Sequence, residues 1–285
     1  MPRLTLRSPA KLNLFLRVLN KRPDGYHNLT TIFERISLYD ELTFRSLSTG
    51  QIKIFCNDPL VPRGTKNLVY KVARKLQNDF GIKDGVAITI RKRIPVAAGL
   101  AGGSSNAATT LLGLNKIWKL KLPHKRLIEY AGRIGSDVPF FLHNCSWGLG
   151  QGRGDRVKPI IATARLWQVV VIPCLKMYSR EVFERLNLRL TKKRGNVNIL
   201  IHYLKKYNKD KVRQLLLNDL ESSILAIRPE LGRVKERLKV VGLQGVCFSG
   251  SGPAVYGIAE SHRKAEKFAR ILRRYYRRVF VVRTS

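Results

Sequence analysis

Apolar and polar side chains alternate in several short stretches near the beginning of the chain. This period of two is typical of strands that bury one face. A turn interrupts the pattern at Arg22–Gly25, where Pro23 fixes φ and Gly25 accepts a positive φ. The stretches predicted as strands in this part are 4–6, 12–16, 31–36, 42–44, 52–55 and 86–90.

Apolar residues at helical spacing predict three helices before residue 135. The first starts at the capping residue Asn67 and ends at Gly81. The second runs from about Asn106 to Lys116, directly after a glycine-rich loop, and the third covers about His124–Arg133.

The pattern of the chain changes after Lys158-Pro159, where we place a domain boundary. Beyond it, strands are predicted at 168–172, 246–248 and 255–258, helices at 181–186, 199–207, 212–217 and 234–241, and the chain ends with one more helix and strand. The sequence therefore predicts an α+β protein with two domains, residues 1–158 and 159–285.

Composition is typical of globular proteins, whereas the charge is extreme. The 285 residues are 44% hydrophobic and 26% charged, which excludes the disordered and fibrous classes. The 54 Lys and Arg residues against 19 Asp and Glu residues give a net charge of +35. The basic residues are spread almost evenly, and the densest cluster, Arg273–Arg278, follows a predicted helix. A solvated basic face explains this better than dedicated RNA binding, so no nucleic-acid partner is expected.

Cysteine spacing and hydropathy indicate the cellular compartment in which the protein is expected to lie. The four cysteines lie far apart and form no CxxC pair, so neither a zinc ribbon nor a disulfide framework is predicted. No apolar stretch reaches the length of a membrane span, and the first residues lead directly into a strand pattern without an apolar signal segment. We therefore expect a cytoplasmic protein with no membrane partner.

A glycine-rich loop between a predicted strand and a predicted helix is the strongest chemical signal. Its small residues let the backbone approach an anion, and the first N–H groups of the following helix point at that anion. The spacing fits neither a Walker A sequence nor a Rossmann fingerprint. We predict a phosphate site here rather than an ordinary glycine turn. The residues are Pro95, Val96, Ala97, Ala98, Gly99, Leu100, Ala101, Gly102, Gly103, Ser104 and Ser105.

Two further residues are candidates for chemistry. Asp137 and Glu129 are the only carboxylates between Asp84 and Asp155, and Glu129 is expected to form a surface ion pair. Asp137 either caps a helix or pairs structurally with a cation, or it takes or orients a hydroxyl proton. Lys11, within an apolar strand, either protects an exposed sheet edge or directs its charge at a phosphoryl group.

A second glycine loop, Phe248–Ala254, connects two predicted strands. As a hairpin loop it needs no function, but beside a phosphate loop it can close over the same anion. The four features together resemble those of the GHMP kinases, over nearly the whole chain.

Local sequences narrow the resemblance to one branch of that family. The chain is similar to the kinases that phosphorylate the 2-hydroxyl of 4-diphosphocytidyl-2-C-methyl-D-erythritol in the non-mevalonate isoprenoid pathway. The similar segments are Pro9–Leu14, Arg22–His27, Gly135–Phe141 and Gly150–Asp155.

The resemblance implies a fold, a cofactor and a catalytic pair. The N-terminal domain would resemble domain two of ribosomal protein S5, and the C-terminal domain would be ferredoxin-like. ATP with Mg²⁺ would bind at Pro95–Ser105, and a small-molecule acceptor would bind in the cleft between the domains. Asp137 would be the base or orienter for the acceptor hydroxyl, and Lys11 would polarise that hydroxyl or the transferring phosphoryl group.

The resemblance also implies an acceptor site. Tyr26 and His27 would take the cytosine, by stacking and by hydrogen bonding, and Phe183 would be the opposing aromatic. Asn13 and Ser179 would complete the substrate-binding residues.

Two positions depart from many relatives, which have glycine and aspartate where this chain has Ala101 and Asn106. Without that carboxylate, the protein ligands of magnesium are not assigned. The alternatives are a GHMP kinase for homoserine, mevalonate or a sugar, and a non-catalytic RNA-binding protein on an S5-like fold.

Overall fold

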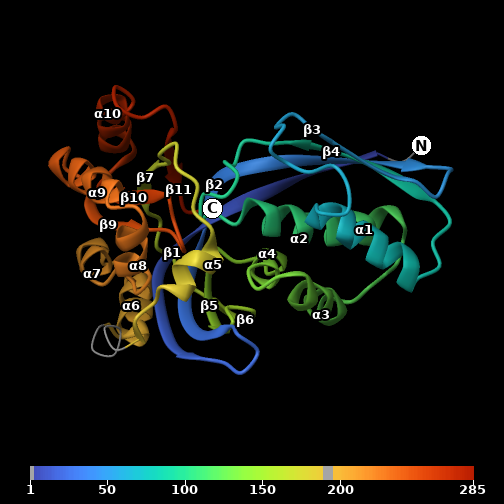
Figure 1. The fold of residues 1–285 in the computed structure, drawn as a ribbon, viewed down its shortest axis with the longest axis horizontal. Helices are drawn as coiled ribbons and strands as arrows, with labels where there is room; N and C mark the ends of the chain where they lie inside the picture. The colour runs from blue at the N-terminus through green and yellow to red at the C-terminus, as the bar shows by residue number, and fades with distance from the viewer. Residues whose placement is uncertain (1–2, 189–194) are drawn as a thin grey trace. The chain divides into compact units, whose positions relative to one another are not determined.

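The computed structural model describes residues 3–188 and 195–285, which form two compact units (Figure 1). The first unit comprises the residues up to Ala10, Leu38–Val96 and Ala101–Asn144, and the second comprises Lys11–Ser37, Ala97–Leu100 and Cys145–Ser285. Each unit draws on several segments, because the long strands β1 (Arg3–Lys21) and β2 (His27–Leu47) contribute to both. The predicted single division at residue 158 stays a prediction.

In the first unit, helices pack against one face of a sheet (Figure 1). The strand order is β3 (Ile52–Cys56), β4 (Gly85–Arg91), β2 and β1, with β3 parallel to β4 and β4 antiparallel to β2. The helices are α1 (Leu68–Asp79), α2 (Gly102–Ile117), α3 (His124–Ile134) and α4 (Val138–Leu142).

Helix α1 confirms its predicted ends. The side chain of Asn67 accepts a hydrogen bond from the backbone N–H of Val69, and Gly81 follows the helix with φ at +58°. Helix α2 begins at Gly102 rather than near Asn106. Glycines inside a helix are unfavourable, but the first turn has no intrahelical N–H partners to lose, so its start extends back into the glycine loop.

The second unit contains a four-stranded antiparallel sheet and the remaining strands. The sheet order is β11 (Val279–Arg283), β7 (Trp167–Val171), β10 (Val255–Ala259) and β9 (Gln244–Phe248). Elsewhere, β5 (Trp147–Gly152) pairs with β2 and with β6 (Arg156–Ile160), and β8 (Leu217–Asn218) lies parallel to β1. The helices are α5 (Ser179–Glu184), α6 (Val197–Lys205), α7 (Lys209–Gln214), α8 (Glu221–Ile227), α9 (Glu230–Val240) and α10 (His262–Leu272).

An apolar core lies against the four-stranded sheet. It includes Val169 and Val171 of β7 and Val255 of β10, packed with apolar residues from α8, α9 and α10. Strands β5, β6 and β8 and helices α4 and α8 were not predicted. Strand β5 was missed because it is rich in glycine; a Cβ on Gly150 would lie 2.6 Å from the ring of Phe33, so the glycine is required by packing and not by a turn.

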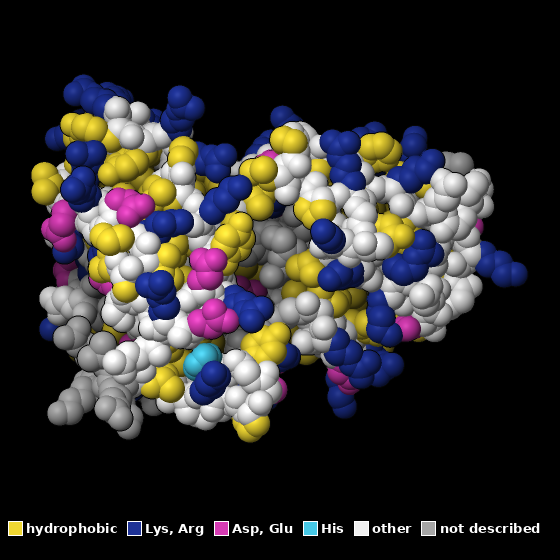
Figure 2. Space-filling model, viewed as in Figure 1, with side chains coloured by type: hydrophobic (Ala, Val, Ile, Leu, Met, Phe, Trp, Pro, Cys, Tyr) yellow, Lys and Arg dark blue, Asp and Glu magenta, His cyan; other side chains and the backbone are white. Residues whose placement is uncertain are grey.

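Basic side chains are dispersed over the face of the molecule that Figure 2 shows. Figure 2 shows Lys and Arg side chains spread over the visible face with few acidic ones among them. The cluster Arg273–Arg278 follows α10, and its four arginines are exposed.

Among the helices of residues 3–188 and 195–285, none is both long and apolar enough to cross a membrane. All four cysteines are free thiols.

One carboxyl group is fully buried in the second unit. Nε2 of Gln168 lies 2.7 Å from both carboxylate oxygens of Glu34, and the hydroxyl of Thr284 donates to one of them at 2.6 Å. Burial raises the pKa of Glu34 to about 7, although these hydrogen bonds and the nearby Arg165 act in the opposite direction.

This carboxyl group predicts a pH dependence of stability. Because the native pKa is raised, the contribution is fully present below pH 4.5 and is lost as pH rises to about 7. Relative to Glu34→Gln, the wild type should lose roughly 2–3 kcal/mol of unfolding free energy between pH 5 and pH 8. Urea unfolding at several pH values measures this, with the exposed Glu129→Gln as control. A pH-independent difference between Glu34→Gln and wild type would contradict the prediction.

Candidate active site

Lys11 and Asn13 lie two residues apart on β1, so their side chains share one face of the sheet. Both are buried, with only 3% and 2% of their surface exposed. Nζ of Lys11 donates to Oδ1 of Asn13 at 2.5 Å, and Nδ2 of Asn13 donates to the hydroxyl of Thr31 at 2.8 Å. This burial contradicts the alternative in which Lys11 protects an exposed edge, and the Asn13 amide fixes the position of the ammonium group.

The second glycine loop packs against Lys11 and against part of the first loop. The hydroxyl of Ser249 donates to the carbonyl of Gly99 at 2.9 Å, and a Cβ on Gly99 would lie only 2.2 Å from the Ser249 carbonyl oxygen. A Cβ on Gly250 would lie 3.4 Å from Nζ of Lys11. The backbone N–H of Lys11 donates to the carbonyl of Leu100 at 3.2 Å. Parts of both glycine loops therefore lie against Lys11, the candidate catalytic lysine, within the second unit.

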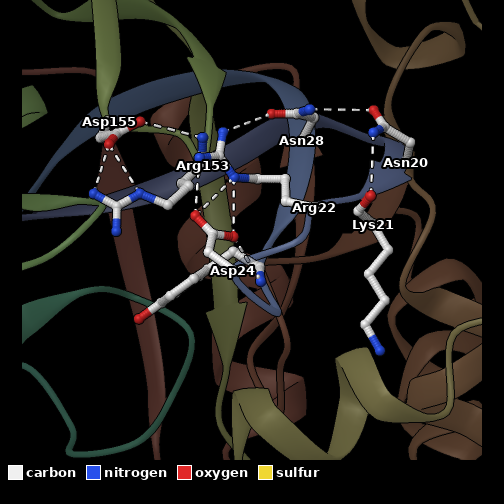
Figure 3. Close-up of polar contacts among 8 residues, drawn as sticks. Asn20, Lys21, Arg22, Asp24, Asn28, Arg153 and Asp155 are labelled. Carbon is white, nitrogen blue, oxygen red and sulfur yellow. Dashed lines mark hydrogen bonds and ion pairs between the residues drawn. The ribbon is translucent and has the colours of Figure 1, made fainter.

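Tyr26 follows the tight turn that connects β1 to β2. The backbone N–H of Arg22 donates to the carbonyl of Tyr26 at 2.7 Å, and Gly25 has the positive φ (+82°) that the sequence predicted. A carboxylate oxygen of Asp24 accepts the backbone N–H of Tyr26 at 3.1 Å. Figure 3 shows Arg22 and Asp24 facing each other within this turn. The turn leaves the Tyr26 side chain 54% exposed, as a ligand-stacking ring requires.

Helix α5 brings two predicted substrate residues to the same place. The rings of His27 and Phe183 are stacked, with centroids 5.2 Å apart and planes 27° apart. One turn earlier on α5, the hydroxyl of Ser179 lies 2.7 Å from that of Ser251 in the second glycine loop. Contacts therefore connect the predicted cytosine site to the loop that packs on Lys11.

The surroundings of His27 favour the neutral form of its imidazole. Its partial burial, and to a lesser degree the charge of Lys21, lower the pKa of His27 from its ordinary value of 6.5. A neutral imidazole has one donor and one acceptor nitrogen, which suits hydrogen bonding to a nucleobase edge.

The remaining part of the glycine loop belongs to the first unit, with Ala101–Ser105 leading into α2. A Cβ on Gly102 would lie 2.8 Å from Nζ of Lys92 and 2.9 Å from a methyl carbon of Ile94, so packing requires this glycine. A Cβ on Gly103 would meet nothing nearer than Leu68, at 4.0 Å. Of Gly102 and Gly103, Gly103 is therefore the one at which the absence of a side chain leaves open space for a ligand.

A buried polar cluster supports the start of α2, and the sequence analysis missed it. The carboxylate of Asp40 accepts Nζ of Lys92 at 2.5 Å, Nδ2 of Asn106 at 2.9 Å and the backbone N–H groups of Arg93 and Ile94 at 2.8 Å. No sequence pattern connects Asp40 to the loop, because the two are distant in sequence and the pairing of β2 with β4 brings them together. A polar residue within the β2 apolar pattern was the available signal.

Asn106 has a structural role in this cluster. Besides Asp40, its amide donates to the hydroxyl of Ser8 at 2.9 Å, and Ser8 donates to Ser105 at 2.8 Å. Asparagine at this position, where many relatives resemble each other in having aspartate, thus avoids placing a second carboxylate beside Asp40. Ala101, the other departure, has φ at +53°, which explains why glycine suits this position in relatives.

Asp137 directly precedes α4 and is half-buried. Its side chain makes no capping hydrogen bond to that helix, which disfavours the helix-cap alternative. Glu129, in contrast, forms the predicted surface ion pair with Arg126 at 2.6 Å. Asp137 belongs to the first unit and Lys11 to the second, so their joint action on one hydroxyl stays a prediction.

Family models match both halves of the chain. Residues 67–144 match the GHMP kinases N terminal domain and residues 200–278 match the GHMP kinases C terminal domain. The first match includes α1, the whole glycine loop and Asp137, and the second includes the second glycine loop. The GHMP kinase fold predicted from the sequence is thus confirmed.

Comparisons with individual proteins specify which GHMP kinases this chain is similar to. The chain is 42% identical over 272 residues to a 4-diphosphocytidyl-2-C-methyl-D-erythritol kinase of Syntrophus aciditrophicus, covering 94% of each chain, and 39% identical over 281 residues to one of Bacillus velezensis, covering 99% and 96%. A crystal structure of 4-(cytidine 5'-diphospho)-2C-methyl-D-erythritol kinase matches with a TM-score of 0.84 at 33% identity, covering 99% and 100%. A homoserine kinase from Cytophaga hutchinsonii shares the fold, with a TM-score of 0.78 at 17% identity, covering 100% and 95%. Full-length identity at this level, together with the site geometry, shows that the chain belongs to the GHMP kinases and, within them, to the 4-diphosphocytidyl-2-C-methyl-D-erythritol kinase family.

Proposed function

We propose that this protein transfers the γ-phosphoryl group of ATP to the 2-hydroxyl of 4-diphosphocytidyl-2-C-methyl-D-erythritol, in the cytoplasm. The observation that carries the proposal is the contact chain in the second unit. It runs from the His27–Phe183 ring stack through the Ser179–Ser251 contact to the loop beside Lys11. A base-binding pair and a fixed cation within one compact unit suit an acceptor with a pyrimidine at one end and a reacting hydroxyl at the other.

The start of α2 supplies the phosphate-binding groups. Its first N–H groups have no intrahelical partners, and the helix dipole adds partial positive charge there. The open space at Gly103 permits a phosphate to approach the backbone. Phosphoryl transfer depends on such positioning and charge stabilisation more than on covalent chemistry.

The polar side chains of Asp40 and Asn106, beside the loop, are already occupied by hydrogen bonds within the protein. The Asp40 carboxylate is already bonded to Lys92, Asn106 and backbone N–H groups, and Asn106 is bonded to Ser8. Within residues 3–188 and 195–285, no group of three or more His, Cys, Asp and Glu side chains is arranged to hold a metal ion. Magnesium would therefore come with the nucleotide phosphates.

Lys11 and Asp137 would act on the acceptor hydroxyl. The ammonium group of Lys11, held by Asn13, would stabilise negative charge on the hydroxyl oxygen or on the transferring phosphoryl group. The carboxylate of Asp137 would accept the hydroxyl proton or orient the hydroxyl in line with the γ-phosphate. The fold does not separate the alternatives, because homoserine and mevalonate kinases have it too.

Substrate choice is tested by a coupled assay of ADP release. With 4-diphosphocytidyl-2-C-methyl-D-erythritol we expect turnover, and with homoserine or mevalonate we expect none above the ATP-only background. CDP should raise the melting temperature while mevalonate leaves it unchanged. Turnover of homoserine or mevalonate with no protection by CDP would overturn the proposed substrate.

The catalytic pair is tested by Asp137→Asn and Lys11→Met, which keep most of the side-chain shape. If Asp137 is a general base, kcat should fall by about 10²–10⁴-fold with KM little changed. Lys11→Met should lose a similar factor, and the double variant should be far less than multiplicatively worse, because residues acting as a unit are non-additive. Near-wild-type kcat in Asp137→Asn, with a lowered melting temperature, would show a structural role instead.

Two neighbouring glycines provide a matched test of the ATP site. Gly103→Val adds a side chain in open space, so the fold should be kept while the Kd for ATP rises roughly tenfold or more, because the phosphates lose their close approach. Gly102→Ala pushes against Lys92 and Ile94, so it should cost about 1–3 kcal/mol of unfolding free energy. Calorimetric titration and urea unfolding measure the two effects. Unchanged ATP affinity in folded Gly103→Val would contradict the site.

A further inference from the structure

Two turns in the second unit each contain an arginine–aspartate pair. In the turn after β1, Nε and Nη2 of Arg22 donate to the Asp24 carboxylate at 2.9–3.1 Å. In the turn between β5 and β6, Nε and Nη2 of Arg153 donate to one oxygen of Asp155 at 3.0 and 2.8 Å. Both guanidinium groups are thus held by at least two hydrogen bonds, which fixes their planes as well as their positions.

The two turns lie side by side. Strand β2 pairs with β5 with Leu29 opposite Gly152, so the residues just before β2 and just after β5 lie at the same end of these strands. Figure 3 shows Arg153 and Asp155 next to Arg22 and Asp24. Each aspartate also attracts the arginine of the other turn, and hydrogen bonding by Arg22 keeps the pKa of Asp24 below its ordinary value. The four side chains therefore form one charge network.

The network reaches the Tyr26 ring. The guanidinium carbon of Arg153 lies 5.1 Å from the ring centroid, within the range of a cation–π contact. Tyr26 is otherwise held by its backbone, through Arg22 and Asp24, while its side chain is more than half exposed. Arg153 is thus a side chain, fixed by its own aspartate, that can restrict the orientation of this exposed ring.

We propose that Arg153, fixed by Asp155, is a positioning residue that holds the Tyr26 ring ready to stack on the nucleobase of the acceptor. This inference rests on the proposed function, because it assumes that Tyr26 binds a cytosine. An exposed aromatic side chain that is ordered before binding loses less conformational freedom when the ligand arrives, so affinity increases without any new contact to the ligand.

Arg153 acts on the ligand through Tyr26, and this separates it from a direct phosphate ligand. A direct ligand would strengthen binding of CDP but not of cytidine, which has no phosphate. A positioning residue strengthens binding of both, because both have the base. It also has no effect once the Tyr26 ring is removed.

The experiment is a double-mutant cycle measured by calorimetric titration with cytidine and with CDP. The variants are Arg153→Gln, Arg153→Lys, Asp155→Asn, Tyr26→Ala and the double variant Arg153→Gln/Tyr26→Ala. Arg126→Gln is the control, because Arg126 also belongs to an arginine–carboxylate pair, although a more exposed one, and lies on α3. Melting temperatures and the Kd for ATP are measured on every variant to exclude folding defects.

We expect Arg153→Gln and Asp155→Asn to raise the Kd of cytidine and of CDP by a similar factor, about 3- to 10-fold. Arg153→Lys should not restore affinity, since lysine keeps the charge but loses the planar fork. KM for the acceptor should rise in parallel while kcat stays within about twofold of wild type, because the reacting hydroxyl is not touched. In the Tyr26→Ala background, Arg153→Gln should add less than about a twofold loss.

Several outcomes would overturn the inference. A loss confined to CDP would make Arg153 a direct phosphate ligand. An equal loss from Arg153→Gln with and without the Tyr26 ring would show that Arg153 does not act through Tyr26. If Arg153→Gln binds cytidine and CDP with wild-type affinity, Arg153 has no role in binding. Failure of the wild type to bind either cytidine or CDP would instead overturn the proposed function, and the inference would fall with it.

Discussion

A buried ammonium group must be held by hydrogen bonds, and the way Lys11 is held organises the second unit. The side-chain amide of Asn13 accepts a hydrogen bond from Lys11 and donates one to Thr31 of β2. The backbone carbonyl of Asn13 accepts a hydrogen bond from the buried hydroxyl of Tyr256 on β10. One asparagine thus connects three strands and fixes one cation. Loss of any partner would leave a buried polar group without its bond, which is costly, so the network favours a single arrangement of these strands.

Glycines that look alike in sequence have different physical causes in this fold. Gly99 is needed because the Ser249 carbonyl packs where its Cβ would lie, and Gly102 is needed because Lys92 and Ile94 do. Gly103 alone of the three has open space in front of it. A glycine-rich loop therefore indicates a phosphate site only in part, since two of these glycines would be required even without a ligand. The helix start and Gly103 are what remain specific to anion binding.

The sequence predicted most of the regular structure, because cap residues, turns and apolar periodicity act locally. The Asn67 cap and the Arg22–Gly25 turn were correct to the residue. Long-range features were missed: β5 is glycine-rich because Phe33 packs against Gly150, and Asp40 lies beside the glycine loop because β2 pairs with β4. The site residues came from resemblance to a family rather than from periodicity. The structure adds the contacts among those residues that lie in one unit.

Charge and recognition act at different ranges in this protein. A net charge of +35 attracts any polyanion, including both expected substrates, so it raises encounter rates without distinguishing one phosphate compound from another. Discrimination must come from short-range groups, and these are neutral where the base would bind: the imidazole of His27, whose pKa is lowered by burial, stacked on Phe183. Where charge does enter that region, as in Arg22 and Arg153, it is paired with Asp24 and Asp155. The pairing restrains the non-specific attraction that these arginines would otherwise add beside the base, and leaves them to orient the turns on which recognition depends.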